Sequence, residues 1–143
     1  MKNFLLPLLL LFIAQTACKK DDPVLTFFKC KIDGVAFESD SLQYPADNLI
    51  EGRLELRFEN GNRSLILGIP EFFGEEGPHE VNWVSYDNGS ATFLGDSGEV
   101  LITEIDKKKE FISGTFSGVC SPIGGGVDME ITDGEFVMEY YEF

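Results

Sequence analysis

Few side chains in this chain could carry out chemistry. His79 is the only histidine, and the three cysteines are Cys18, Cys30 and Cys120. A cysteine or serine nucleophile would need His79 as its base, and no G-x-S-x-G turn accompanies it. Zinc needs several histidine, cysteine or carboxylate ligands, and one histidine leaves too few. We therefore interpret His79 as a loop residue that enters a strand.

Carboxylates and amides near turns raise the question of calcium. Hard oxygen ligands on loops are what this ion takes, and the four candidates are Asp87, Asn88, Asp96 and Glu99. The same residues are also what Asp-Asn-Gly and Asp-Ser-Gly turns require. The sequence leaves calcium binding open, and we expect no other metal and no cofactor.

Paired carboxylates could also hydrolyse a glycoside, and the adjacent Glu75 and Glu76 are the obvious pair in sequence. Neighbouring residues are poorly placed to flank one bond, and among 25 acidic residues some pair lies close whatever the function. We therefore expect a protein that is not an enzyme, with a carboxylate-based envelope hydrolase as an alternative.

The N-terminus predicts export and a lipid anchor. Residues 4–14 are apolar and follow Lys2, as in a secretory signal. They are too few to span a bilayer, which takes about 20 apolar residues. The run Gln15-Thr16-Ala17-Cys18 resembles the lipobox of bacterial lipoproteins, in which the cysteine is acylated and the peptide is cut before it. We expect a signal peptide over residues 1–17, a lipidated tether over 18–24 and one β domain over 25–143.

Two further short motifs concern the destination of the chain. Lys20, Asp21 and Asp22 resemble the surface-export signal of lipoproteins from Bacteroidota, so we expect an outer-membrane protein that faces the cell exterior. Attachment to the periplasmic face of the outer membrane is the alternative. Asp40-Ser41-Leu42 resembles the short acceptor motif for O-glycosylation in the same bacteria, which makes Ser41 a candidate acceptor.

The charge balance restricts the partners. The chain has 25 acidic and 11 basic residues, and its formal net charge is −14. This charge argues against binding of nucleic acid or of anionic lipid head groups by the protein surface. It favours cations or a basic partner.

In the rest of the chain, apolar and polar residues alternate with a period of two. Between residues 53 and 59, charged residues alternate with Leu54, Leu56 and Phe58, as in a half-buried strand. Asn60-Gly61 suits a tight turn, and a second alternating run follows it. We predict a β-hairpin over residues 53–70.

Other alternating runs predict further strands, over residues 25–32, 35–38, 80–84, 91–94, 99–105, 110–120, 127–131 and 135–141. Turn-like residues separate them, among them Asp33-Gly34, Asp96-Ser97-Gly98 and Asp133-Gly134. No segment has a helical stripe. The predicted fold is all-β, an antiparallel sandwich or barrel of about eight to ten strands.

The two cysteines of the predicted domain lie on inward faces of their strands. Cys30 shares a face with Phe28 and Ile32, and Cys120 shares one with Phe116. In an exported domain this arrangement predicts a disulfide between Cys30 and Cys120. Two separate buried thiols are the alternative, because cysteine is often buried.

The aromatic residues of two predicted loops could contact a ligand. We expect candidate contact residues at one end of the sheet, namely Phe72, Phe73, His79, Tyr86 and Asn88. A role in the core is the alternative for the aromatic side chains.

Three segments of the chain together resemble a known protein family. They are "FKCKIDGVAF", "GEVLITEIDKKKEFISGTFSG" and "VDMEITDGEFVMEY". They are similar to small β-rich lipoproteins of Bacteroidota that form a domain family of unknown function. The resemblance implies an all-β domain behind a lipid anchor and carries over no catalytic or binding residue. We expect a non-catalytic role, either binding of a glycan or protein or support of the envelope, with a carrier of small apolar ligands as a further alternative.

Overall fold

The computed structural model describes residues 25–39, 46–50 and 52–141. The predicted signal peptide, the tether with Cys18, Lys20, Asp21 and Asp22, and the candidate acceptor Ser41 lie outside these residues. The described residues form ten strands: β1 (Phe27–Ile32), β2 (Val35–Glu38), β3 (Ala46–Ile50), β4 (Arg53–Asn60), β5 (Arg63–Pro70), β6 (Gly77–Val81), β7 (Trp83–Asp87), β8 (Thr92–Asp106), β9 (Phe111–Pro122) and β10 (Met129–Tyr141). The described residues include no helix long and apolar enough to cross a membrane.

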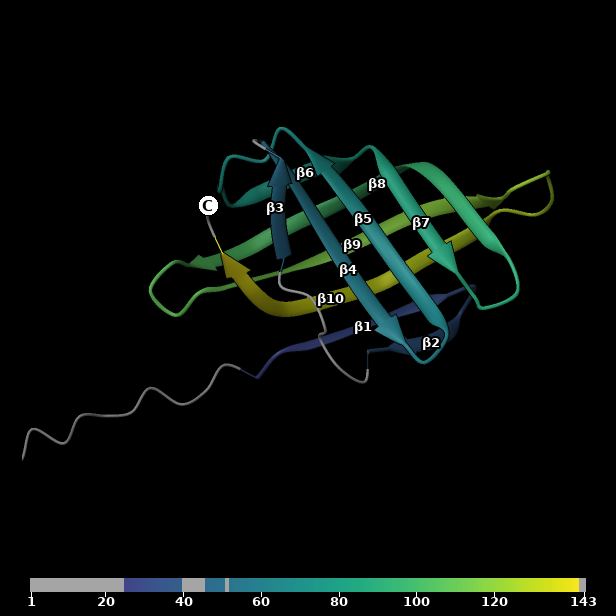
Figure 1. Ribbon diagram of the computed structural model, residues 1–143, viewed down its shortest axis with the longest axis horizontal. Coiled ribbons are helices and arrows are strands. Elements are labelled where there is room, and N and C mark those ends of the chain that lie inside the picture. The colour runs from purple at the N-terminus through teal and green to yellow at the C-terminus, as the bar shows by residue number, and fades with distance from the viewer. Residues whose placement is uncertain (1–24, 40–45, 51, 142–143) are drawn as a thin grey trace, which may run out of the picture.

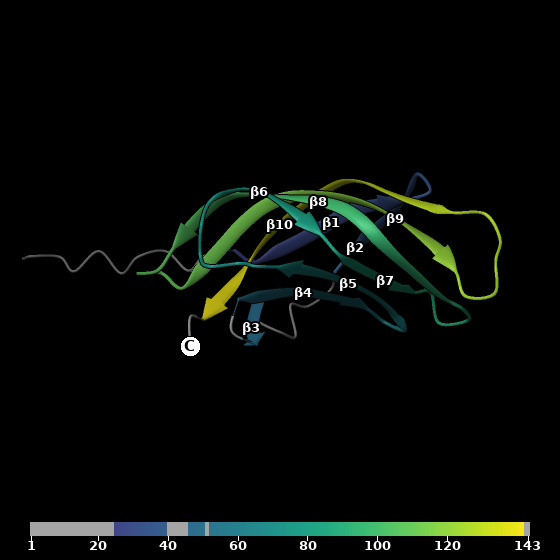
Figure 2. The same cartoon turned by 90° about the horizontal axis from the view of Figure 1, so that it is seen from above.

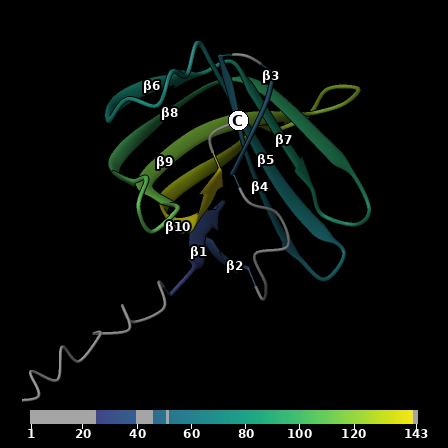
Figure 3. The same cartoon turned by 60° about the vertical axis from the view of Figure 1, so that its left-hand side comes forward.

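The strands form one sheet that curls into a half-barrel, which confirms the predicted all-β fold (Figure 1). Seen from above, β6, β8, β9, β10 and β1 make one layer, and β3, β4, β5 and β7 make the other (Figure 2). The pairs are antiparallel except where the end of β10 meets β3, through Tyr140–Ala46 and Tyr141–Asp47. Figure 3 shows the two layers joined by the curl of the sheet.

The core lies between the two layers. Inward residues of β4 and β5 are fully buried, including Leu54, Leu56 and Leu67. The Phe28 ring stacks on Phe58 at 3.5 Å and on Phe116 at 5.2 Å between centroids. Aromatic rings from both layers thus fill the space inside the curl.

The predicted hairpin is confirmed as β4 and β5. Asn60 pairs with Arg63, so Gly61 and Asn62 form a two-residue turn. Gly61 has a φ of 59°, which a residue without Cβ adopts at little cost. The hydrophobic residues of this hairpin therefore face the core together.

Small residues on the inner face of β9 allow the curl. Ile112, Phe116 and Cys120 alternate there with Gly114 and Gly118, and all are buried. A Cβ on Gly114 would collide with the carbonyl oxygen of Leu101. The neighbouring strand therefore comes closer to β9 than any larger residue would permit.

Side-chain contacts join the β1–β2 hairpin to the β4–β5 hairpin. Ser39 donates a hydrogen bond from Oγ to the carbonyl oxygen of Glu59 at 2.8 Å, and Asn60 donates from Nδ2 to the carbonyl oxygen of Glu38. The Arg63 guanidinium lies 5.1 Å from the centre of the Phe37 ring. These contacts join strands that are distant in the sheet order.

Two predicted turns are wrong, because the chain passes through them without reversing. Asp133-Gly134 lies inside β10, where the pairing with β9 shifts its register and Asp133 takes a φ of 52°. Asp96-Ser97-Gly98 lies inside β8, at a second register shift. Both sites are irregularities of long strands, since neighbouring strands hold the chain on both sides.

Candidate functional site

The predicted contact residues do not form a common site. Phe72 and Tyr86 are buried in the core, whereas Phe73 is 70% exposed. The His79 ring packs against Phe72 with centroids 5.2 Å apart, and its Nε2 lies 3.0 Å from the carbonyl oxygen of Glu75. The prediction of Phe72 and Tyr86 as contact residues is therefore wrong.

The two predicted contact loops also lie at opposite ends of the sheet. The end of β5 pairs with the start of β7 at Gly68–Trp83, and the start of β5 pairs with the end of β7 at Ser64–Asp87. The loop after β5 and the loop after β7 are consequently separated by the length of these strands. Asn88 shapes its own loop, because its Oδ1 accepts hydrogen bonds from the backbone amides of Ser90 and Ala91.

The predicted disulfide is not formed. Cys30 on β1 and Cys120 on β9 are free, buried thiols, and β10 lies between their strands. Adjacent strands are about 4.8 Å apart, so two spacings exceed the roughly 7 Å that a disulfide tolerates between Cα atoms. Burial raises the pKa of Cys30 to about 12, partly offset by the charge of Arg63, and raises that of Cys120 to about 11.

Of the four candidate calcium ligands, Asp87 and Asn88 serve the turn after β7, whereas Asp96 and Glu99 lie within β8. Asp87 accepts hydrogen bonds from the Gly89 amide at 2.7 Å and from Thr92 Oγ1 at 3.0 Å. Across residues 25–39, 46–50 and 52–141, no group of three histidine, cysteine or acidic side chains could hold a metal ion.

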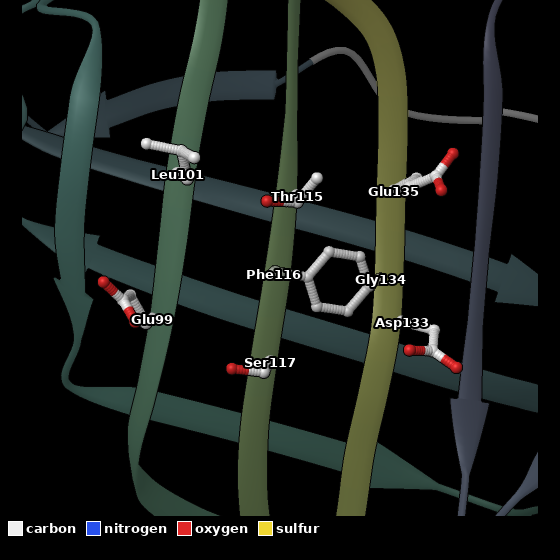
Figure 4. A pocket seen from close by; sticks show the side chains of 8 residues that line it. All are labelled: Glu99, Leu101, Thr115, Phe116, Ser117, Asp133, Gly134 and Glu135. Carbon is white, nitrogen blue, oxygen red and sulfur yellow. The ribbon is translucent and has the colours of Figure 1, made fainter.

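A groove lies on the outer face of the sheet, over β9 (Figure 4). Around Thr115 and Ser117 it measures about 500 Å³. A second hollow, beside Ser117 and Val119, has a volume of about 310 Å³. A third, beside Val119 and Ser121, has a volume of about 510 Å³. Successive hollows share lining residues, so they form one channel open to solvent, which we call the outer groove. From Thr115 to Ser121 its length is about 20 Å.

The floor of the outer groove follows from the alternation of β9. Thr115, Ser117, Val119 and Ser121 point outward, opposite the buried side chains of the same strand. Figure 4 shows Thr115 and Ser117 in the middle, with Glu99 and Leu101 on one side and Asp133 and Glu135 on the other. Because the floor residues are small and the flanking residues are larger, the outer face is hollowed along β9.

Carboxylates line both walls of the outer groove. On the side of β10, Glu135 pairs with Lys29 at 2.9 Å and Asp133 pairs with Lys31 at 2.9 Å. The hydrogen bond from Lys31 to Asp133, together with the charge of that carboxylate, raises the pKa of Lys31. These two pairs neutralise the β10 wall at one end of the groove.

The opposite wall carries a pair of like charges. Glu80 on β6 and Glu99 on β8 are directly opposed in the antiparallel ladder, and both line a hollow of about 460 Å³ beside Pro78. Like charges in this position destabilise a sheet. Neither makes an ion pair with a residue that the structure describes. This wall therefore presents concentrated negative charge to a ligand.

The groove can bind a ligand along its length through hydroxyl groups, carboxylates and the exposed side chains of Leu101 and Val119. Sequence reasoning missed it. The outward row of Ser113, Thr115 and Ser117 is a signal that could have indicated it, because exposed strand faces usually carry larger charged residues.

We compared the chain with models of known protein families, with curated proteins and with solved structures, and no match was found in any of the three comparisons.

Proposed function

We propose that this protein is a lipid-anchored outer-membrane protein that faces the cell exterior and binds a glycan or protein ligand without turning it over. The outer groove is its binding site. The lipobox-like residues ending at Cys18 and the acidic signal after it support the location. A role in envelope structure is the broader alternative, and the groove favours binding.

The observation that carries the proposal is the position of the outer groove on the solvent-facing side of the sheet. Its floor strand β9 is paired along its length with β8 and β10, so the floor residues are held in place by two ladders. An open groove of this kind admits an extended ligand from solvent. Binding energy there comes from many shallow contacts along the groove.

A carrier of small apolar ligands is less well supported. Such a carrier needs an enclosed apolar space, commonly of about 300 Å³ or more. In the described residues the interior is occupied by stacked rings, with Phe58 and Phe116 centroids 6.0 Å apart and Phe136 beside both. The large hollows named above lie outside this core.

A hydrolase is the second candidate, and the Glu80–Glu99 pair is the observation that favours it. Carboxylates on directly opposed residues can approach to about 5 Å, which is the separation found in retaining glycosidases. A general acid is usually buried among apolar side chains, however, and both glutamates are exposed. Binding is therefore the better-supported function.

The test uses a substitution that fills the groove. Ser117→Arg places a large side chain on the floor, and Ser117→Ala leaves the floor open. Binding of the full chain to a panel of cell-surface glycans and peptides should be lost in Ser117→Arg and kept in Ser117→Ala. Turnover of a panel member that disappears in Glu80→Gln or Glu99→Gln would replace the binding proposal with the hydrolase.

A further inference from the structure

We infer that the occupant of the outer groove is a basic segment of a partner protein, bound in an extended conformation. This inference rests on the proposed function, since it names the ligand class of the same site. The width of the groove, its charges and its exposed apolar residues support it.

The dimensions of the groove suit one extended chain. Its two walls stand on β8 and β10, which flank β9 and are separated by two strand spacings, about 9 to 10 Å. Its length of about 20 Å along β9 corresponds to about six extended residues. Alternate side chains of an extended segment point to opposite sides, so they would reach the two walls in turn.

The charges of both walls call for a cationic ligand. Asp96 and Glu99 stand on β8, and Asp128 and Glu130 stand on or beside β10. None of the four makes an ion pair within the described part of the chain. Lysine or arginine side chains at successive positions of the segment would meet carboxylates on each side.

The opposed Glu80 and Glu99 add a reason for positive charge at this place. Their repulsion is present in the free protein, because they are direct partners in the ladder. A basic side chain lying between them would relieve it. The free energy of binding therefore includes the removal of an unfavourable interaction.

Exposed apolar residues in the groove distinguish a polypeptide from a simple cation. Leu94 and Leu101 are each 42% exposed and Val119 is 38% exposed, and all three line the groove. Lysine and arginine can pack their methylene stems on such residues while their charged ends reach carboxylates. A divalent ion has no group that would use these contacts.

The experiment measures binding of a labelled peptide of lysines and serines to the full chain in a neutral detergent at physiological ionic strength. The comparison peptide has glutamine in place of lysine. The groove variant carries Glu99→Gln and Glu130→Gln. The control variant carries Glu38→Gln and Glu59→Gln, which remove the same charge from strands that do not line the groove.

We expect the lysine peptide to bind, and the groove variant to bind it at least about threefold more weakly, since exposed ion pairs each contribute a modest amount. The control variant should keep its affinity. Ser117→Arg should abolish binding and Ser117→Ala should not. Equal weakening by the groove and control variants would mean attraction to the net charge alone and would overturn the inference.

Other results separate this inference from the proposed function. Binding of a neutral oligosaccharide in the groove, with no binding of the lysine peptide, would overturn the inference and leave the binding function standing. Turnover of a ligand by the unmodified protein that is lost in a single carboxylate variant would overturn the proposed function itself.

Discussion

At the scale of single residues, burial keeps the two core thiols protonated. For Cys30 the pKa rises from 9.0 to about 12, so between these values the folded protein holds a proton that the unfolded chain has lost. The contribution of the Cys30 proton to the free energy of unfolding is therefore fully present below pH 9.0 and is lost as the pH rises toward 12. We expect Cys30→Ala to reduce this alkaline loss, measured by urea unfolding at neutral pH and at about pH 10.

The same thiols give a direct chemical test. In the native protein both should react slowly with iodoacetamide, because the thiolate is the reactive form and both side chains are buried. After denaturation without a reductant, Cys30 and Cys120 should both be alkylated. Two unreactive cysteines under those conditions would indicate the disulfide after all.

The neighbouring Phe72 and Phe73 provide a matched pair of substitutions. Phe72 is fully buried and Phe73 is 70% exposed. Phe72→Ala should lower the free energy of unfolding by about 3 to 5 kcal/mol, because it leaves a cavity. Phe73→Ala should change it by about 0.5 kcal/mol or less. Equal effects in denaturant titrations would contradict the inward position of Phe72.

This pair also shows where residue-level prediction fails. The period-two rule assigns inward and outward residues correctly within β1 and β4, including Cys30 and Leu56. It does not apply in the loop after β5, where Glu71 has a φ of 52° and breaks the alternation. The orientation of Phe72 depends on that backbone angle, which the residue types do not specify.

At the scale of elements, the two inward glycines of β9 differ in the space available to them. A Cβ on Gly114 would overlap a backbone carbonyl and the Phe136 ring, whereas one on Gly118 would come no closer than 3.3 Å to another atom. Gly114→Ala should destabilise the protein by about 1 to 3 kcal/mol, because the core is overpacked. Gly118→Ala serves as the control on the same face and should cost clearly less. The measurement is thermal or urea unfolding of both variants, and equal losses would contradict the close approach of β8 to β9.

Element boundaries were predicted best where a turn reverses the chain. Asp33-Gly34 between β1 and β2 was identified correctly, and both residues have positive φ angles. Asp133-Gly134 has the same residue types, and Asp133 also has a positive φ, yet Gly134 does not and the pair lies within β10. The difference comes from the neighbouring strands β1 and β9, which pair with β10 on both sides of the irregularity. Local sequence cannot distinguish these cases, because the deciding partners are distant in the chain.

At the scale of the whole molecule, the proposed location can be tested at Cys18. Mass spectrometry of the mature protein should find an acylated N-terminal cysteine, and Cys18→Ala should release or mislocalise the protein. Protease added to intact cells should remove the domain. Replacing Lys20, Asp21 and Asp22 by alanine should protect it. A mature N-terminus at another residue would rule out the anchor.

The overall charge leads to an expectation about the ligand, whereas the pattern of residues does not locate a site for it. A net charge of −14 already favours a cationic ligand. The outer groove could not be located from the sequence, because Glu80, Glu99 and Glu130 come together only through the pairing of β6, β8, β9 and β10. Their convergence depends on strand order and register, which the alternation within each strand does not determine.

The two faces of β9 have consequences for how the protein can evolve. Its inward residues, Gly114, Phe116 and Cys120 among them, are fixed by the packing of the core, whereas Thr115 and Ser117 contact solvent. Substitutions at the outward positions change the groove with little effect on stability. Evolution can therefore reshape the outer groove at these positions while the inward residues of β9 stay the same.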